Sequence, residues 1–333
     1  MTTETIRIGA LAPLSPPGWV QAGRHLLAGM ALAVREANAA GGRPLELIVR
    51  DTTADPAKAE AAVDDLAALG VVALAGEYHS VVARAVAARA DALGLPFLCA
   101  SAVLDALVDQ PTDGVARLCP AQSHGWRLYA DYLLNQGHTR IAVAIAPSIY
   151  WASGVRILRE HGLEVVELDP ANVPDALADS GASALLLLVG HPEPALAIVR
   201  AVRADPRLAG ILIGAPAGQP ELMGEDGAAI PFLRYRPERL PPLGERVEAV
   251  LREELGEAPS FVALEGYDTI LVLAERLRTH GDWSTVAVEG TRGPIRFSRV
   301  PGIDVWQWAW PPVQVVDRDP ADPDRFRVLS ARS

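Results

Sequence analysis

Small and hydroxyl-bearing residues follow two consecutive strand-like runs of the chain. The segments are Gly76–Ser80 and Cys99–Ala102, and a helix-like run follows the first of them. The first turn of a helix has unsatisfied backbone N–H groups and a partial positive charge, so carboxylates and amides bind there readily. The two turns together predict a small-molecule site, although Ser80 or Ser101 taken alone fits an ordinary helix cap.

Strands alternate with helices through the first hundred residues. Such alternation predicts right-handed parallel units and a doubly wound sheet, in which the turns at the carboxyl ends of the strands line one crevice. The expected strands are Ile6–Leu11, Leu45–Val49, Val71–Ala75 and Pro96–Cys99, and the expected helices are Gly23–Ala39, Pro56–Leu69, Val82–Ala92 and a short one around Leu104–Val108.

A second α/β series begins near Gln122, so the sequence predicts two α/β lobes. Its expected helices are Trp126–Asn135, Trp151–His161, Pro194–Ala204 and Leu243–Leu255, and its expected strands are Ile141–Ala146, Glu164–Leu168, Ala184–Val189 and Gly210–Ile213. A third piece follows, with an expected helix Ser260–Arg278 and an expected strand Pro294–Ser298. The run Val305–Val316 alternates like an exposed edge strand. Its two prolines predict a bend or a crossing between lobes, because proline cannot donate to a sheet.

Composition narrows the class of partner. The chain has 333 residues, half of them hydrophobic, which is enough for two domains. A net charge of -11 and a pI near 5.1 argue against nucleic acid and against anionic membrane surfaces. The apolar run Leu185–Val189 is far too short to cross a bilayer, so the protein is not expected to be membrane-embedded. Met1–Thr5 leads directly into a strand with no signal peptide, which predicts a cytoplasmic protein or one whose leader was removed.

No catalytic, cofactor-binding or metal-binding pattern is found. Glycine-rich nucleotide motifs and a Gly-x-Ser-x-Gly turn are missing, and the seven histidines lack ligand spacing. His79 beside Ser80 has no orienting acid, which argues against a nucleophile and its base. We therefore expect no enzyme, no cofactor and no metal. Cys99 and Cys119 fall at strand ends, where one disulfide or two buried thiols are both compatible with the pattern.

Several segments, in their order and spacing, resemble one known family. They are Ile6–Ser15, Ala39–Leu47, Asp51 with Asp55-Pro56, Gly76–Ser80, Ser101-Ala102, Ala263–Asp268 and Arg292–Phe297. The chain is similar, from Ile6 to about Asp317, to the type I periplasmic binding proteins of the branched-chain amino acid (Leu/Ile/Val) class. The resemblance implies two Rossmann-like lobes, joined by three crossovers, that close on a ligand between them. Lobe 1 is expected over residues 1–120 and 258–302, and lobe 2 over 121–257 and 303–333.

The same resemblance implies the ligand-binding residues. In lobe 1, Ser80 supplies a hydroxyl and an N–H, Ala100 or Ser101 a carbonyl, and Ser101 or Ala102 an N–H. Trp19 covers the ligand, and Tyr150 from lobe 2 stacks on it. The complete expected set is Trp19, Tyr78, His79, Ser80, Ala100, Ser101, Ala102, Tyr150 and His191.

One departure from the family bears on the ligand. Branched-chain amino acid binders place a carboxylate after the strand matching Gly210–Ile213, where it pairs with the ligand's ammonium. Here residues 214–220 contain no acid, and an unpaired buried ammonium costs several kcal/mol. An α-amino acid is therefore disfavoured unless Glu77, Glu193 or Glu221 replaces the missing charge. A neutral amide or an apolar or aromatic carboxylate fits better.

Two functions remain open from the sequence. The first is a solute receptor of an ABC importer, with a membrane permease as partner and a periplasmic location. The alternative is a cytoplasmic amide-type sensor that controls a regulatory protein partner, which the Gly76-x-Tyr78-x-Ser80 pattern and the leaderless start favour.

Overall fold

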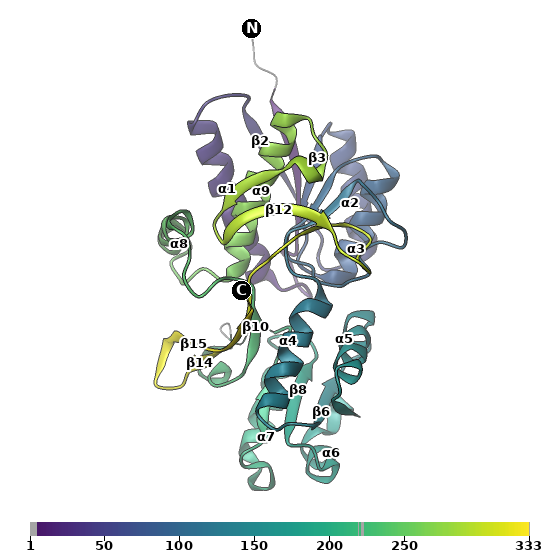
Figure 1. Cartoon of the computed structure of the whole chain (residues 1–333), viewed down its shortest axis with the longest axis vertical. Helices are drawn as coiled ribbons and strands as arrows, with labels where there is room; N and C mark the ends of the chain where they lie inside the picture. Colours follow the sequence, from purple (N-terminus) through teal and green to yellow (C-terminus); the bar gives the residue numbers. More distant parts are fainter. Residues whose placement is uncertain (1–4, 219, 221–222, 333) are drawn as a thin grey trace. The chain divides into compact units, whose positions relative to one another are not determined.

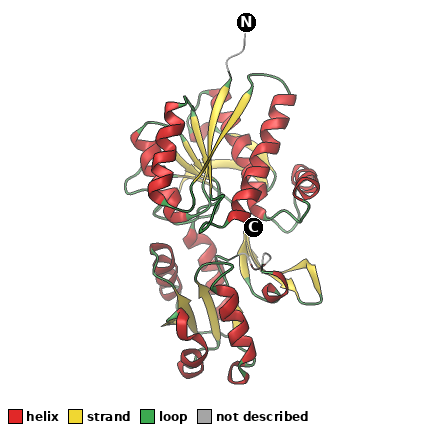
Figure 2. Cartoon of the chain, turned by 180° about the vertical axis from the view of Figure 1, so that it is seen from behind, coloured by secondary structure: helices red, strands yellow, loops and turns green. Residues whose placement is uncertain are grey.

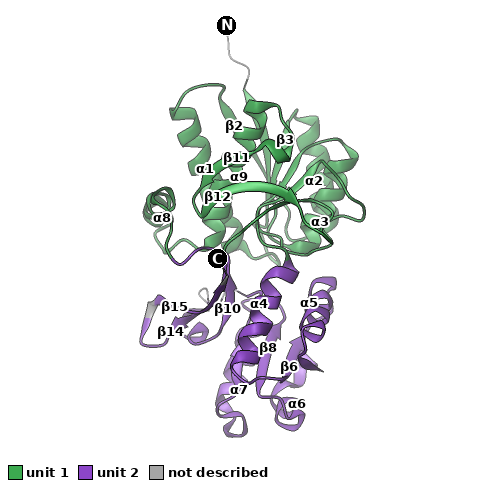
Figure 3. Cartoon of the chain, in the orientation of Figure 1, with its two compact units in different colours: residues 1–121, 239–312 green, residues 122–238, 313–333 purple. Residues whose placement is uncertain are grey.

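A computed structural model describes residues 5–218, 220 and 223–332. The chain divides into two compact units (Figure 3). Unit 1 contains residues 1–121 and 239–312, and unit 2 contains residues 122–238 and 313–333. Each unit has its own sheets, so each is described by itself.

The sheet of unit 1 has eight strands in the order β11-β12-β13-β5-β4-β3-β1-β2. Of these strands, β2, β3 and β12 are labelled in Figure 1. Strands β1 to β5 and β13 run parallel, whereas β12 is antiparallel to β13 and to β11. The strands are β1 (Ile6–Ala12), β2 (Leu45–Asp51), β3 (Ala73–Gly76), β4 (Phe97–Cys99), β5 (Val115–Arg117), β11 (Ala287–Gly290), β12 (Gly293–Arg299) and β13 (Trp306–Trp308).

Helices cover both faces of this sheet (Figure 2). They are α1 (Val20–Ala39), α2 (Pro56–Ala68), α3 (Ser80–Ala92), α8 (Pro242–Leu255) and α9 (Phe261–Thr279), with a short 3₁₀ turn over Trp283–Thr285. Asp55 begins α2, because its carboxylate accepts from the amides of Ala57 and Lys58. α1 and α9 pack backbone against backbone: a Cβ at Gly29 would lie 1.9 Å from the Ala263 carbonyl oxygen.

Unit 2 contains a parallel sheet in the order β7-β6-β8-β9 and an antiparallel sheet in the order β10-β14-β15. Every residue of β8 is buried, which explains its unbroken apolar sequence. The strands are β6 (Arg140–Ile145), β7 (Glu164–Leu168), β8 (Ala184–Leu188), β9 (Leu212–Gly214), β10 (Phe232–Arg234), β14 (Val313–Asp319) and β15 (Asp322–Arg332). The helices are α4 (Gln122–Asn135), α5 (Ile149–Glu160), α6 (Val173–Ser180) and α7 (Ala195–Ala204), with 3₁₀ turns over Pro170–Asn172, Pro206–Leu208 and Gly224–Gly227.

The α/β fold, with a parallel sheet in each of two units, agrees with the sequence prediction, but two predicted elements are wrong. Residues 104–108 form a loop rather than a short helix. The run Val305–Val316 is two strands in different sheets: β13 lies inside the large sheet between β5 and β12, and β14 belongs to unit 2. The chain passes between the units at Pro312, where the prolines predicted a bend or a crossing.

The expected limits of the lobes also differ from the observed division. Residues 121, 239–257 and 303–312 are expected in the second lobe but belong to unit 1. Helix α8 packs on α1 and α9, and β13 pairs with β5, which explains the difference. Cys99 and Cys119 are free, buried thiols. None of the described helices has the length and apolar character that a transmembrane span requires.

Candidate functional site

The loop after β3 begins at a position that only glycine can occupy. Gly76 has a φ of +130°, and a Cβ there would lie 2.1 Å from the Leu11 carbonyl oxygen of the neighbouring β1. The close approach of the two strands fixes where the following residues, Glu77 to Ser80, leave the sheet.

Glu77 holds this loop from inside. One carboxylate oxygen accepts from the amides of Tyr78 and His79 at 2.8 and 2.9 Å, and the other accepts from the Thr52 hydroxyl at 2.8 Å. Burial raises the pKa of Glu77 to about 7, although these three hydrogen bonds act in the opposite direction. The amides of Tyr78 and His79 are therefore already used within the protein.

His79 joins this loop to the loop after β1. Its Nε2 accepts from the Trp19 amide at 3.1 Å, and burial lowers its pKa to about 4. The ring is thus neutral at pH 7, and this bond assigns its proton to Nδ1. The Trp19 and Tyr78 rings meet edge to face, with centroids 5.8 Å apart. His79 thus holds the Trp19 backbone in place.

Ser80 connects the loop after β3 to the loop after β4. Its hydroxyl oxygen accepts from the Leu104 amide at 3.3 Å, so its own proton stays available to an acceptor. The amides of Ala100 and Ser101 donate to the carbonyls of Gly76 and Glu77 at 2.7 and 3.3 Å. The structure therefore brings the expected unit 1 residues together: Trp19, Tyr78, His79, Ser80, Ala100, Ser101 and Ala102.

Two neighbouring amides in this cluster have no acceptor. The N–H groups of Ala102 and Val103 make no hydrogen bond within the described residues, yet both residues are buried. Buried backbone N–H groups are nearly always paired with protein, water or ligand. Ala102 was among the expected donors. Val103 was not, because nothing in an apolar β-branched residue indicates the direction of its backbone.

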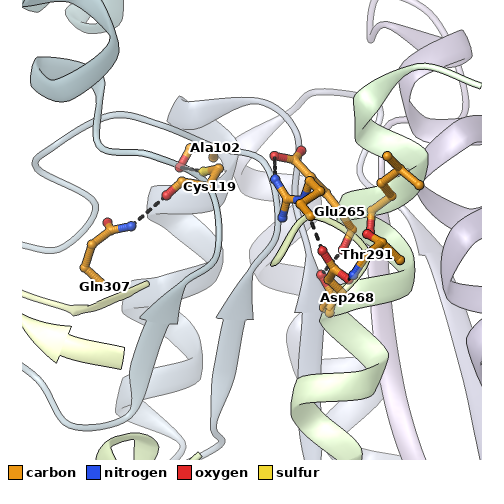
Figure 4. Close-up of polar contacts among 9 residues, drawn as sticks. Ala102, Cys119, Glu265, Asp268, Thr291 and Gln307 are labelled. Carbon is orange, nitrogen blue, oxygen red and sulfur yellow. Dashed lines mark hydrogen bonds and ion pairs between the residues drawn. The ribbon is translucent and has the colours of Figure 1, made fainter. Parts of the chain in front are cut away.

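An ion cluster lies close to the same loop (Figure 4). The Arg292 guanidinium contacts Asp268 and Glu265, each at 3.0 Å, and all three side chains are fully buried. Burial raises the pKa of Glu265 to about 7 and also raises the pKa of Asp268, against the effect of Arg292. Glu265 Oε2 and the Ser101 hydroxyl meet no partner in good hydrogen-bonding geometry, although Ser101 is close enough to lower the pKa of Glu265. The sequence analysis did not identify Glu265 as a site residue.

Unit 2 contributes aromatic rings at the start of α5. The Tyr150 ring packs on Trp151 at 4.8 Å and edge-on to the buried Trp126 at 6.1 Å. The Ser148 hydroxyl accepts from the Tyr150 amide at 3.2 Å, and the Gln122 side-chain amide donates to the Tyr150 carbonyl at 2.9 Å. The expected stacking residue is therefore held at both ends of its backbone.

His191 lies after β8 in unit 2. Its Nδ1 lies 3.0 Å from the Val189 carbonyl oxygen, and burial lowers its pKa to about 4, so the ring is neutral and Nδ1 is the donor. Glu193 in the same turn accepts from the Ala197 amide at 3.2 Å through an exposed carboxylate.

Three acids were candidates for pairing with the ammonium of a ligand, and the structure describes two of them, Glu77 and Glu193. Both oxygens of Glu77 already accept hydrogen bonds, and Glu193 serves the first turn of α7. Glu221, the third candidate, lies outside the described residues. Over the described ranges, no three or more His, Cys, Asp or Glu side chains are grouped so that they could hold a metal ion.

In α/β folds with parallel sheets, the loops that follow the strands are where ligands usually bind, and the free donors described above lie on such loops. A family model described as periplasmic binding protein matches residues 5–291, so the chain belongs to that family. This confirms the resemblance found in the sequence. No curated protein sequence matches the chain.

Solved structures agree on the fold. The branched-chain amino acid transporter substrate-binding protein LivJ of Streptococcus pneumoniae, in complex with isoleucine, has a TM-score of 0.84 at 18% identity, covering 98% of this chain and 100% of its own. A leucine complex of an ABC transporter substrate-binding protein of Desulfitobacterium hafniense gives 0.78 at 22% identity, covering 98% and 100%. A benzoate complex of a solute-binding protein from R. palustris gives 0.81 at 16%, covering 98% and 96%. At these identities the likeness establishes the fold alone.

Proposed function

We propose that this protein is a solute-binding receptor of an ABC importer whose ligand carries a carboxylate or amide oxygen. The observation that carries the proposal is the set of free donors in unit 1. The Ser80 hydroxyl has its proton available, and the amides of Ala102 and Val103 lack acceptors within the described residues. Three such donors on neighbouring loops suit an oxygen with two or more lone pairs.

The rest of the proposed ligand is apolar or aromatic. Trp19 and Tyr78 flank the donors in unit 1, and Tyr150 with Trp151 forms the aromatic group of unit 2. Glu77 already accepts three hydrogen bonds within the protein, and the exposed Glu193 carboxylate already holds the Ala197 amide, so neither residue is dedicated to pairing with an ammonium. An aromatic carboxylate or its amide therefore fits the available groups better than leucine does.

Ligand binding by hinge closure, with Tyr150 and His191 added to the unit 1 donors, is part of the same proposal. Closure follows only if the ligand binds the closed state more tightly than the open one. Small-angle X-ray scattering tests it: saturating ligand should lower the radius of gyration, and an unchanged value would contradict closure.

A panel of ligands tests the proposed ligand class. Benzoate and benzamide should raise the melting temperature, and leucine should not, because its ammonium would lack a partner. Calorimetry with Ser80→Ala should show an affinity loss of roughly tenfold for the best ligand, since one hydrogen bond to it is removed. Ser284→Ala, a surface serine of the same unit, is the matched control and should bind like the wild type.

Two results would count against this proposal. Strong stabilisation by leucine, with none by benzoate or benzamide, would overturn the ligand class. An unchanged affinity of Ser80→Ala would place the site elsewhere.

The proposed partner is a membrane permease, and the proposed location is the periplasm. Cell fractionation and cross-linking in the native host test both. Recovery only in the cytosol, cross-linked to a soluble protein, would instead support the amide-type sensor.

A further inference from the structure

Three consecutive carbonyls of the loop after β4 are bonded by buried side chains. The Ala102 oxygen lies 3.5 and 3.2 Å from the thiols of Cys99 and Cys119. The oxygens of Val103 and Leu104 both accept from Nη1 of Arg117, at 3.0 and 2.5 Å. Side chains from β4, β5 and the residue two beyond β5 thus set the direction of the loop.

Gln307 on β13 fixes Arg117 in turn. Its Oε1 accepts from Arg117 Nε at 2.7 Å, and its Nε2 donates to the Cys119 carbonyl at 2.8 Å (Figure 4). Arg117 is fully buried, and within the described residues no carboxylate pairs with it. Its other contacts are the carbonyls of the loop, so the loop is what this buried cation binds.

The direction of the carbonyls determines the direction of the amides. In a trans peptide the C=O of one residue and the N–H of the next point opposite ways, and the peptides of this loop are trans. The Leu104 amide follows the Val103 carbonyl, and it meets the Ser80 hydroxyl as this rule requires. The Val103 amide follows the Ala102 carbonyl and is likewise turned away from the thiols. It has no acceptor within the described residues.

We infer that Arg117 and Gln307 are positioning residues for ligand binding. They hold the carbonyls of residues 103 and 104 inward, which keeps the Leu104 amide on the Ser80 hydroxyl oxygen and leaves that hydroxyl's proton for the ligand. The Val103 amide belongs to the peptide of the Ala102 carbonyl, and the thiols of Cys99 and Cys119 set its direction. Neither side chain needs to touch the ligand. The inference deepens the proposed function and rests on it for the identity of the site.

Gln307→Met tests the inference without removing the buried cation. Methionine has a similar volume but offers Arg117 no strong acceptor and the Cys119 carbonyl no donor. We expect hydrogen exchange of the Leu104 amide, measured by NMR without ligand, to become at least roughly tenfold faster relative to the Leu74 amide. The Leu74 amide, bonded to the Pro96 carbonyl at 2.8 Å, reports the general stability of the same sheet.

Affinity for benzoate should fall by roughly tenfold in the same variant. Gln307→Glu should restore most of the affinity and the slow exchange, because a carboxylate still accepts from Arg117. Gln314→Met, at a buried glutamine of unit 2, is the matched control and should change neither Leu104 exchange nor binding. Combining Gln307→Met with Ser80→Ala should cost less than the sum of the single effects, because both act through the bond between Ser80 and Leu104.

Separate results decide the two proposals. Unchanged exchange at Leu104 in Gln307→Met, or equal acceleration at Leu104 and Leu74, would overturn the positioning role. Strictly additive effects on affinity would overturn the route through Ser80. Failure of benzoate, benzamide and leucine to bind the wild type would reject the proposed ligand site, while the exchange ratio would still decide whether Arg117 and Gln307 orient the loop.

Discussion

The two units differ in the kinds of side chain that they present at the candidate binding residues. Thirteen of the sixteen buried polar or charged side chains in the described chain lie in unit 1, including Glu77, Arg117 and Arg292. Unit 2 contributes the rings of Trp126, Tyr150 and Trp151, held by a serine and a glutamine. Buried polar networks are costly unless satisfied, and when satisfied they fix one geometry. Unit 1 therefore has the character of a rigid hydrogen-bonding platform, and unit 2 that of an apolar contact surface.

This difference indicates where directional recognition resides. Hydrogen bonds depend steeply on angle and distance, so their donors must be held precisely. Aromatic packing tolerates more variation in the position of the ligand. Substitutions of buried polar residues in unit 1 should therefore impair stability or binding, and the expected effects differ in size. The same substitutions at exposed positions serve as controls that show whether burial causes the effect.

Arg292→Met should have the largest effect on stability. It leaves the carboxylates of Glu265 and Asp268 buried without their cation, which typically costs about 3–5 kcal/mol. Urea denaturation followed by circular dichroism measures the loss. Arg278→Met is the control: it removes a surface ion pair with Glu275 on α9, the helix that also carries Glu265 and Asp268. This variant should lower the free energy of unfolding by less than about 1 kcal/mol. Equal losses of unfolding free energy in the two variants would show that the buried ion cluster stabilises unit 1 no more than a surface ion pair does.

Glu77→Gln should remove a pH dependence that belongs to unit 1. In the folded chain the pKa of Glu77 is about 7, whereas its ordinary value, which applies to the unfolded chain, is 4.5. The unfolded chain therefore loses its proton first, and this group's contribution to stability falls as pH rises from 4.5 to 7. The shift corresponds to about 3 kcal/mol over that range. The measurement is the difference in unfolding free energy between the wild type and the variant at each pH.

That difference is needed because other groups titrate over nearly the same range. Burial lowers the pKa values of His25, His79 and His191 to about 4 from 6.5, so their contributions to stability rise with pH between 4 and 6.5. These contributions cancel in the comparison with Glu77→Gln. Glu193→Gln, at an exposed position of unit 2, should follow the wild-type profile. A constant difference between wild type and Glu77→Gln from pH 4.5 to 7 would show that Glu77 does not titrate there.

Local patterns predicted most of the parallel sheets and the loops that follow them. The strand Glu164–Leu168 is found as expected, and Ser80 and Ser101 do follow neighbouring strands. The failures have a non-local cause. Residues 104–108 do not form a helix, since the Val103 and Leu104 carbonyls bond to Arg117 rather than to amides four residues on. The pairing of Arg117 with Gln307 joins residues 190 apart in the chain, a separation at which periodicity carries no information.

The run from Val305 to Val316 failed for a related reason. Alternating tryptophans predicted an edge strand, but Trp308 is buried in the sheet and only Trp310 is largely exposed, at 82%. Alternation of residue types is typical of any strand with two different faces. Whether such a strand lies at the edge or in the interior of a sheet depends on the strands that pair with it, here β12 and β5. The Val103 amide was missed in the same way, since its direction follows from carbonyls bonded by distant side chains.

Cys119→Ala should have the smallest effect in the polar network of unit 1. Its thiol and that of Cys99 both lie within bonding distance of the Ala102 carbonyl, so removing one leaves the acceptor satisfied. The expected loss of stability is about 1 kcal/mol, from the vacated volume. Affinity for the best ligand should change less than about threefold, since the Cys99 thiol still lies within bonding distance of the Ala102 carbonyl and Arg117 still holds the next two carbonyls. A tenfold loss of affinity in this variant would mean that the Cys119 thiol is needed to orient the Ala102 carbonyl, and with it the Val103 amide, and that this amide matters more to binding than the Ser80 hydroxyl that Arg117 serves. The ordering of unit 1 would then lie in its thiols and not in its buried cation.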